Sequence, residues 1–186
     1  MIRIVIADDH EIVRAGLKQI IADDSDMEVA GESNNGENMI ELVKKNDYDV
    51  VLLDLKMSGL SGIEAIKHIK AIKPELPIIV LSMHAEDQYA VRTIKAGASG
   101  YLTKETAAEN LVNAIRKVVS GGKYISSTLA ETLADTLAGG GAARPHESLT
   151  DREFQVMCMI ASGKTVSEIA SELFLSVKTI STYRQR

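Results

Sequence analysis

Reactive side chains directly follow four short apolar runs in the first two thirds of this 186-residue sequence. They comprise carboxylates, a hydroxyl and an amine. Such a set could bind a cation and accept a phosphoryl group if the fold brought it together. The residues are Asp8 and Asp9 after the run 4–6, Asp54 after 50–53, Ser82 after 78–81, and Lys104 after 101–102.

The three acids need a neutralising partner if they lie close together. Two carboxylates about 5 Å apart repel by roughly 3 kcal/mol at an effective dielectric near 20. Asp8, Asp9 and Asp54 would then share a proton or bind a cation. Oxygen ligands select hard cations over zinc. We expect Mg²⁺, with Mn²⁺ as an alternative, because Mg²⁺ favours sites that phosphate oxygens complete.

Asp54 is the candidate nucleophile toward a phosphoryl donor, and its attack would form an acyl phosphate. The Ser82 hydroxyl and the Lys104 ammonium suit the oxygens of that phosphoryl group. The alternative interpretation makes the acids helix caps or solvated turn residues. It does not account for the matching Ser and Lys after other apolar runs.

The elements that would position these residues alternate between two types. Apolar runs without polar alternation are typical of strands covered on both faces, and stretches of helical spacing lie between them. Five repeats predict an α/β fold, with a parallel sheet between helices and a ligand crevice at the carboxyl ends of its strands. Ser61 with Glu64, and Thr106 with Glu109, form capping-box pairs that predict helix starts. The runs are 4–6, 27–30, 50–53, 78–81 and 101–102, and the helical stretches include 12–21, 63–72 and 111–119.

Glycine clusters at 121–122 and 139–141 predict a flexible connection between two domains. Between them, Leu129, Leu133 and Leu137 recur at helical spacing and predict a connecting helix. This leucine stripe either packs on its own domain or contacts a partner or the other domain.

Three short helices are expected after the connection. A capping-box pair begins each of the first two helices, and Gly163 lies between these two helices. Ser176 is the expected N-cap of the third. Two helices joined by a tight turn form a helix-turn-helix. The pairs are Thr150 with Glu153 and Thr165 with Glu168.

Composition narrows the class of protein. Hydrophobic residues make up 45% and charged residues 25%, which indicates a folded protein, and the net charge is −5. The longest apolar run, 156–161, is too short to span a bilayer, so we expect no membrane partner. A single cysteine, Cys158, excludes an internal disulfide framework and favours the cytoplasm. The stretch 173–186 has basic residues and no acid, so it could meet a polyanion despite the net charge.

The sequence resembles a known family. Residues 1–120 resemble the receiver domain of response regulators, through IVIADDH, VVLLDLKMSGLSGIE, IIVLSMH and GASGYLTKE. Residues 146–186 resemble the LuxR-type helix-turn-helix, through LTDREFQVMCMIASGKTVSEIASELFLSVKTISTYRQR. Together they resemble the NarL/FixJ class of two-component regulators. This resemblance implies a flavodoxin-like, doubly wound five-stranded receiver, a linker over 121–145, and a small all-α DNA-binding domain.

The resemblance also implies roles for the reactive residues. Asp54 would be the phosphoacceptor, charged by a sensor histidine kinase or a small phosphodonor. Self-phosphorylation and autodephosphorylation at this residue would be the only catalysis. Ser82 and Lys104 would contact the phosphoryl group, and Tyr101 would change rotamer as the switch. Mg²⁺ would be held by Asp8, Asp9, Asp54 and the backbone carbonyl of Lys56.

In the second domain, the resemblance implies contacts with double-stranded DNA and a homodimer after phosphorylation. Three polar residues of the recognition helix would read base edges, and four further residues there would contact phosphates. Family members carry a further helix, so we expect this domain to be truncated in or just after the recognition helix. The base-reading residues are Ser181, Thr182 and Gln185, and the phosphate-contacting ones are Lys178, Thr179, Arg184 and Arg186.

Two other functions remain open from the sequence. The helical domain could bind a protein instead of DNA, in which case capture of the partner would be insensitive to salt. A flavodoxin-like phosphohydrolase would use the acid cluster for turnover, but no substrate-pocket residues are evident beyond that cluster.

Overall fold

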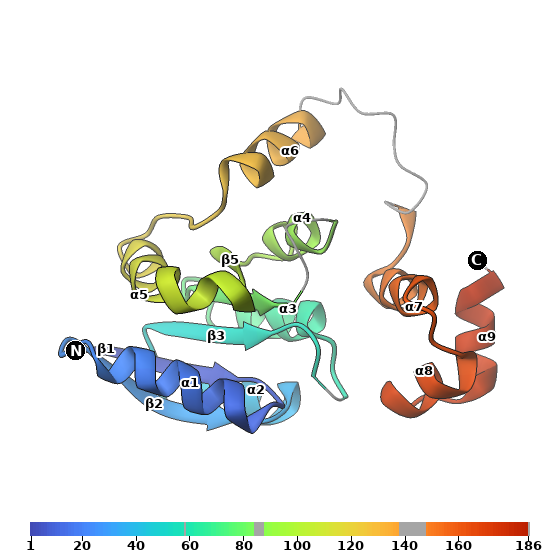
Figure 1. Cartoon of the computed structure of the whole chain (residues 1–186), viewed down its shortest axis with the longest axis horizontal. Helices are drawn as coiled ribbons and strands as arrows, with labels where there is room; N and C mark the ends of the chain where they lie inside the picture. Colours follow the sequence, from blue (N-terminus) through green and yellow to red (C-terminus); the bar gives the residue numbers. More distant parts are fainter. Residues whose placement is uncertain (58, 84–87, 138–147, 186) are drawn as a thin grey trace. The chain divides into compact units, whose positions relative to one another are not determined.

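The computed structural model describes residues 1–57, 59–83, 88–137 and 148–185 (Figure 1). The chain forms two compact units, Met1–Ala134 and Asp135–Arg186, each described here by itself. Among the described helices, none has both the length and the apolar composition needed to cross a membrane.

The first unit is built on a five-stranded parallel sheet in the order β2-β1-β3-β4-β5. This confirms the predicted α/β class. The edge strand β2 is longer than the run that predicted it, because polar residues occupy its partly exposed positions. Its register with β1 shifts between Ile4 and Val5. The strands are β1 Ile2–Ala7, β2 Met27–Ser33, β3 Val50–Asp54, β4 Ile78–Ser82 and β5 Gly100–Thr103.

Five helices cover the two faces of this sheet (Figure 1). Alternate residues of each strand point to opposite faces. Ile4 and Ile6 therefore pack with α1 and α5, whereas Val5 and Ala7 pack on the face that α2, α3 and α4 cover. The helices are α1 Glu11–Ala22, α2 Gly36–Lys45, α3 Gly62–Ile72, α4 Gln88–Lys95 and α5 Lys104–Val119.

The start of α5 differs from the prediction. The pair of Thr106 and Glu109 was expected to begin this helix, but Thr103 is its N-cap, and the Thr103 hydroxyl accepts a hydrogen bond from the Thr106 N–H. Strand β5 thus continues directly into α5 at Lys104. The capping box of Ser61 and Glu64 at α3 is confirmed.

After α5 the chain returns to the sheet. Tyr124 forms a parallel bridge with Gly100 of β5, and helix α6 (Ser127–Leu137) follows. Leu129 is buried in the core on the α2–α4 side of the sheet, and Leu133 packs against that core. The leucine stripe therefore packs on its own domain as far as its side chains are described, which excludes that of Leu137. The predicted boundaries of receiver, linker and helical domain stay predictions.

The second unit contains the three expected helices α7 (Asp151–Ala161), α8 (Val166–Glu172) and α9 (Val177–Gln185). Both predicted capping boxes are present. Ser176 accepts a hydrogen bond from the Thr179 N–H at 3.0 Å, as expected of an N-cap. Gly163 adopts φ 88° between α7 and α8. A small apolar core joins the helices into the predicted helix-turn-helix; its buried members include Val156, Ile169, Leu173 and Ile180.

Candidate functional site

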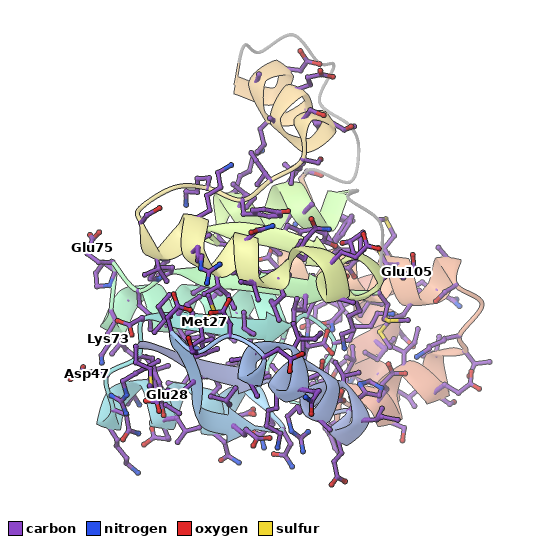
Figure 2. All side chains as sticks on the ribbon, turned by 60° about the vertical axis from the view of Figure 1, so that its left-hand side comes forward. Met27, Glu28, Asp47, Lys73, Glu75 and Glu105 are labelled. Carbon is purple, nitrogen blue, oxygen red and sulfur yellow. The ribbon has the colours of Figure 1, made fainter. Side chains whose placement is uncertain are left out.

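The predicted site residues lie at the carboxyl ends of the strands. Asp8 and Asp9 follow β1, and Asp54 is the last residue of the neighbouring β3. Lys104 begins α5, directly after β5. Figure 2 shows Glu105, the next residue, at the opposite end of the first unit from Asp47, Lys73 and Glu75. The chain thus gathers the reactive groups at one end of the sheet, as predicted.

The three acids form a tight cluster. Asp8, Asp9, His10 and Asp54 each offer one ligand atom, and these atoms all lie within 4.8 Å of one another. Asp8 is fully buried and Asp54 is 2% exposed, whereas 34% of the Asp9 side chain is exposed. The site therefore presents two buried carboxylates and opens to solvent on the side of Asp9.

Lys104 joins the two buried acids. Its Nζ donates to Asp54 Oδ2 at 2.8 Å and lies 2.6 Å from Asp8 Oδ2. The second contact is a close ion pair, so the same ammonium serves both buried carboxylates. One ammonium partly neutralises two carboxylates, and the cluster keeps a net negative charge.

Burial and charge shift two pKa values in this site. Burial raises the pKa of Asp54 above its ordinary value and the Asp8 charge adds to the rise, although Lys104 opposes it. Burial disfavours the Lys104 ammonium, but the hydrogen bonds and charges of Asp54 and Asp8 outweigh it and raise the pKa of Lys104. The lysine is thus firmly cationic, and the Asp54 carboxylate is held in a state that favours a bound cation or proton.

His10 belongs to the cluster, although the sequence analysis gave it no place there. Its Nδ1 lies 2.8 Å from Asp9 Oδ1 and 3.1 Å from Asp8 Oδ1, and its backbone N–H donates to Asp8. The only sequence signal was its position directly after the two acids. Arg14 was also missed; its guanidinium donates to the Asp8 backbone carbonyl at 2.7 Å and helps to hold the turn after β1.

The segment after β3 is fixed around Asp54. The Lys56 N–H donates to Asp54 Oδ1 at 3.2 Å, which places Lys56 beside the acid. The Gly62 N–H donates to the Leu55 carbonyl, and a Cβ on Gly62 would lie only 2.6 Å from Leu55 Cα. A side chain at Gly62 would therefore displace the backbone next to Asp54.

Ser82 and Tyr101 lie on the two strands beyond β3. Ser82 ends β4 and is paired in register with Thr103, while the preceding Leu81 is paired with Asp54. Ser82 is thus one register position from the acid, and it is buried. Tyr101 is 1% exposed and belongs to the core on the α2–α4 side. The structure therefore places Ser82 at the same end of the sheet as the acids. It places Tyr101 in the hydrophobic core.

The donor set fits a hard divalent cation. It consists of carboxylate oxygens from Asp8, Asp9 and Asp54, whose charge the single Lys104 ammonium neutralises only in part. His10 adds one nitrogen. The acidic pocket is therefore compatible with metal binding.

The predicted DNA-contacting residues lie on α9, around the buried Ile180. Lys178, Thr182, Arg184 and Gln185 are exposed. Ser181 and Thr179 are half-buried. The hydroxyls of Ser181 and Thr182 donate to backbone carbonyls one turn earlier, which leaves their oxygens able to accept from another group. Arg186 lies outside the described residues.

Two family models match the chain. "Response regulator receiver domain" matches residues 4–116, and "Bacterial regulatory proteins, luxR family" matches residues 147–186. Response regulator UvrY of Escherichia coli (strain K12) is 40% identical over 187 residues, covering 100% of this chain and 86% of UvrY.

Solved structures of RcsB are also similar. RcsB from Salmonella enterica serovar Typhimurium, bound to promoter P1flhDC in the presence of the phosphomimetic BeF3⁻, is 30% identical with a TM-score of 0.66, covering 99% of this chain and 88% of RcsB. A structure of two RcsB dimers bound to two parallel DNAs is 30% identical with a TM-score of 0.65, over the same shares. The chain belongs to the response regulators of the NarL/FixJ class, with a receiver domain followed by a LuxR-type helix-turn-helix domain.

Proposed function

We propose that this protein is a transcription regulator whose DNA binding is controlled by phosphorylation of Asp54. The observation that carries the proposal is the Asp54 carboxylate itself. It is buried at the end of β3, bonded to Lys104 and surrounded by two further acids. A burial-raised pKa makes this carboxylate a more basic nucleophile than a solvated one.

The reaction is a phosphoryl transfer. A carboxylate oxygen of Asp54 attacks phosphorus, the new O–P bond forms, and the bond from phosphorus to the donor breaks with its electron pair leaving on the donor. The donor is a phosphohistidine of a sensor kinase or a small acyl phosphate. Water attack on the acyl phosphate returns inorganic phosphate and the free carboxylate, so these two reactions are the only catalysis that we assign.

The cation would be held by side chains of Asp8, Asp9 and Asp54 and by the backbone carbonyl of Lys56. We assign Mg²⁺, with Mn²⁺ as the alternative, because the acids supply hard oxygen ligands. When bound, the ion neutralises charge on the phosphoryl oxygens. Lys104 places a second positive charge at the same point, so the transferred group meets a less repulsive site than the acids alone would offer.

Three residues then read the phosphoryl group. We assign the Ser82 hydroxyl as a hydrogen-bond donor to a phosphoryl oxygen, and Lys104 as its ion-pair partner. Tyr101 is the proposed switch, because its strand β5 pairs with β4, which ends at Ser82, and leads directly into Lys104. Its rotamer would report whether β4 and α5 have moved toward the phosphoryl group.

The second unit is the proposed DNA-binding part. Exposed Lys178 and Arg184 of α9 are suited to phosphates, as we propose for Thr179 and Arg186, and the polar face of Ser181, Thr182 and Gln185 to base edges. The similarity to RcsB structures with DNA supports DNA over a protein as the target. We also propose a homodimer of the phosphorylated form, acting in the cytoplasm.

Phosphorylation is tested by intact mass after incubation with acetyl phosphate and Mg²⁺. The wild-type chain should gain one phosphoryl group, Asp54→Asn should gain none, and the matched control Asp47→Asn, an exposed acid at the other end of the sheet, should be labelled normally. Normal labelling of Asp54→Asn would refute the assignment.

Selection from a random double-stranded DNA pool, with and without acetyl phosphate, tests whether labelling increases sequence-specific binding.

A further inference from the structure

Phe174, in the turn between α8 and α9, has a backbone conformation that bulky residues rarely adopt. Among the described residues it is the one non-glycine residue with a positive φ, at 54°. The Phe174 N–H donates to the Ser171 carbonyl at 3.3 Å, and the Leu175 N–H donates to the Ala170 carbonyl at 2.9 Å. These two bonds end the helix and fix the left-handed residue between them. A large side chain crowds the backbone in this region, which costs free energy.

The other helices that end in this way have glycine at the equivalent position. After α7 the same pair of hydrogen bonds encloses Gly163, with φ 88°. Helices α4 and α5 likewise end with Gly97 and Gly121 in left-handed conformations. Glycine adopts this backbone without crowding. Phe174 therefore occupies a position where the local structure favours glycine.

The side chain of Phe174 contributes little to the core of the second unit. It is 75% exposed, whereas the preceding Leu173 is buried in that core and the following Leu175 packs against it. Burial stabilises an apolar side chain in proportion to the area removed from water, and this ring remains largely in water. The stability of the unit therefore does not account for phenylalanine at this position.

The surroundings of Phe174 favour a polyanion as its partner. Val177, the first residue of α9, is 51% exposed, so two apolar side chains lie on the surface where this helix begins. Phe174 and Val177 are called the apolar pair below. The exposed Lys178 follows directly, and the stretch 173–186 has basic residues and no acid. The apolar pair thus continues the surface of α9 that we assign to DNA.

We propose that the apolar pair contacts the 5-methyl groups of thymines in the major groove of the target DNA. The inference rests on the proposed function above and adds two residues to those assigned to base edges. The recognition helix of a helix-turn-helix presents its N-terminal residues to the bases. The thymine methyl is the apolar group that the major groove displays, and apolar side chains read it by contact. The target site therefore contains thymine opposite the start of α9.

Replacement of thymine by deoxyuridine tests this contact, because deoxyuridine lacks only the methyl group. The full chain, treated with acetyl phosphate and Mg²⁺, is titrated by fluorescence anisotropy with the selected DNA site, each thymine being replaced in turn. The wild type should lose affinity about fourfold at one or two thymines, the effect of one buried methyl-sized group. Phe174→Gly should bind the unmodified site at least about tenfold more weakly and lose nothing further at those thymines.

The same variant should make the second unit more stable. Phe174→Gly relieves the crowding, so amide exchange in α7–α9 should slow by about threefold, since this relief exceeds the added backbone entropy of glycine. Weaker DNA binding then cannot come from misfolding. Phe174→Leu keeps an apolar side chain and should bind DNA more tightly than Phe174→Gly. Met157→Ala removes another exposed apolar side chain of this unit and is the control that should leave DNA affinity unchanged.

Each contrary result has a distinct meaning. If Phe174→Gly binds the selected site as tightly as the wild type, the DNA contact is refuted, a protein becomes the partner of the apolar pair, and the proposed function survives. Faster amide exchange in this variant would show that the ring stabilises its own unit, which overturns the inference. Weaker binding of the variant with no effect of deoxyuridine at any thymine would overturn the assignment to thymine. If the wild type selects no DNA, the proposed function itself fails.

Discussion

Lys104 donates to Asp54 at 2.8 Å across 50 positions of sequence. The same ammonium lies 2.6 Å from Asp8, so one cation joins the ends of β1 and β3 to the start of α5. This arrangement has consequences for stability as well as for phosphoryl transfer, because removal of the cation leaves two buried acids facing each other.

Lys104→Met should destabilise the receiver. Breaking a buried ion pair typically costs about 3–5 kcal/mol. We expect the free energy of unfolding at pH 7.5 to decrease by an amount near the lower end of that range. At pH 5 the loss should be smaller, because burial raises the pKa of Asp54 and its carboxyl takes up a proton more readily there. Urea unfolding at both pH values measures this effect, and the exposed Lys95→Met is the control. Equal losses at the two pH values would contradict the explanation.

Asp54→Asn should stabilise the metal-free protein as the pH rises. The fold raises the pKa of Asp54, so the native state holds this proton more tightly than the unfolded chain does. That stabilising contribution is complete below the unfolded pKa and is lost as the pH rises through the folded pKa. Asn cannot ionise and escapes the loss. Urea unfolding at pH 4 and pH 7.5 should show the gain only at pH 7.5, and added Mg²⁺ should diminish it by stabilising the wild type.

Gly62→Ala should impair the site through the backbone. The new methyl group would meet the Leu55 backbone next to Asp54, and overpacking of this kind costs about 1–3 kcal/mol. Acetyl phosphate labelling should slow as well. Gly16→Ala is the matched control, because no atom lies within 4 Å of its added Cβ, and the better helix propensity should raise stability by about 0.5–1 kcal/mol. Unchanged labelling of Gly62→Ala would show that the segment adjusts freely.

Thr150→Ala should destabilise the second unit alone. The Thr150 hydroxyl accepts from the Glu153 N–H, and Glu153 Oε2 accepts from the Thr150 N–H at 2.9 Å. Loss of such an N-cap costs about 1 kcal/mol. Amide exchange in α7–α9 should accelerate accordingly, while exchange in the sheet of the first unit serves as the internal control. Faster exchange in both units would point to a wider effect.

Lys178→Ala should weaken DNA binding similarly for all sequences. An exposed lysine that contacts a phosphate releases about one counterion, so the slope of log affinity against log salt should fall by about 1. Fluorescence anisotropy at several salt concentrations measures the slope, with the exposed Lys95→Ala in the receiver as the control. A change restricted to one DNA sequence would instead indicate base reading by Lys178.

The carboxyl ends of the strands were predictable because buried parallel strands leave continuous apolar runs. A polar residue that directly follows or ends such a run, such as Asp54, must therefore lie at the carboxyl ends of the strands. The same logic places Ser82 and Lys104 at that end of the sheet.

Other features depend on information that local sequence does not carry. Thr103 and Thr106 are both suitable caps, and only the end of β5 decides between them. Helix α2 was not identified from its spacing. The turn of the exposed His10 ring toward the acids and the pairing of Tyr124 with β5 depend on tertiary contacts, which periodicity does not reveal.

The two edge strands of the sheet, β2 and β5, are protected in different ways from pairing with a strand of another molecule. Edge strands invite pairing with another molecule's strand, and β5 is partly protected by Tyr124. Strand β2 carries instead the charged Glu28 and Glu32, and the shift in its register with β1 interrupts a regular hydrogen-bonding row. These charges and this irregularity make β2 a poor template for intermolecular β-aggregation at the concentrations that a crowded cell imposes.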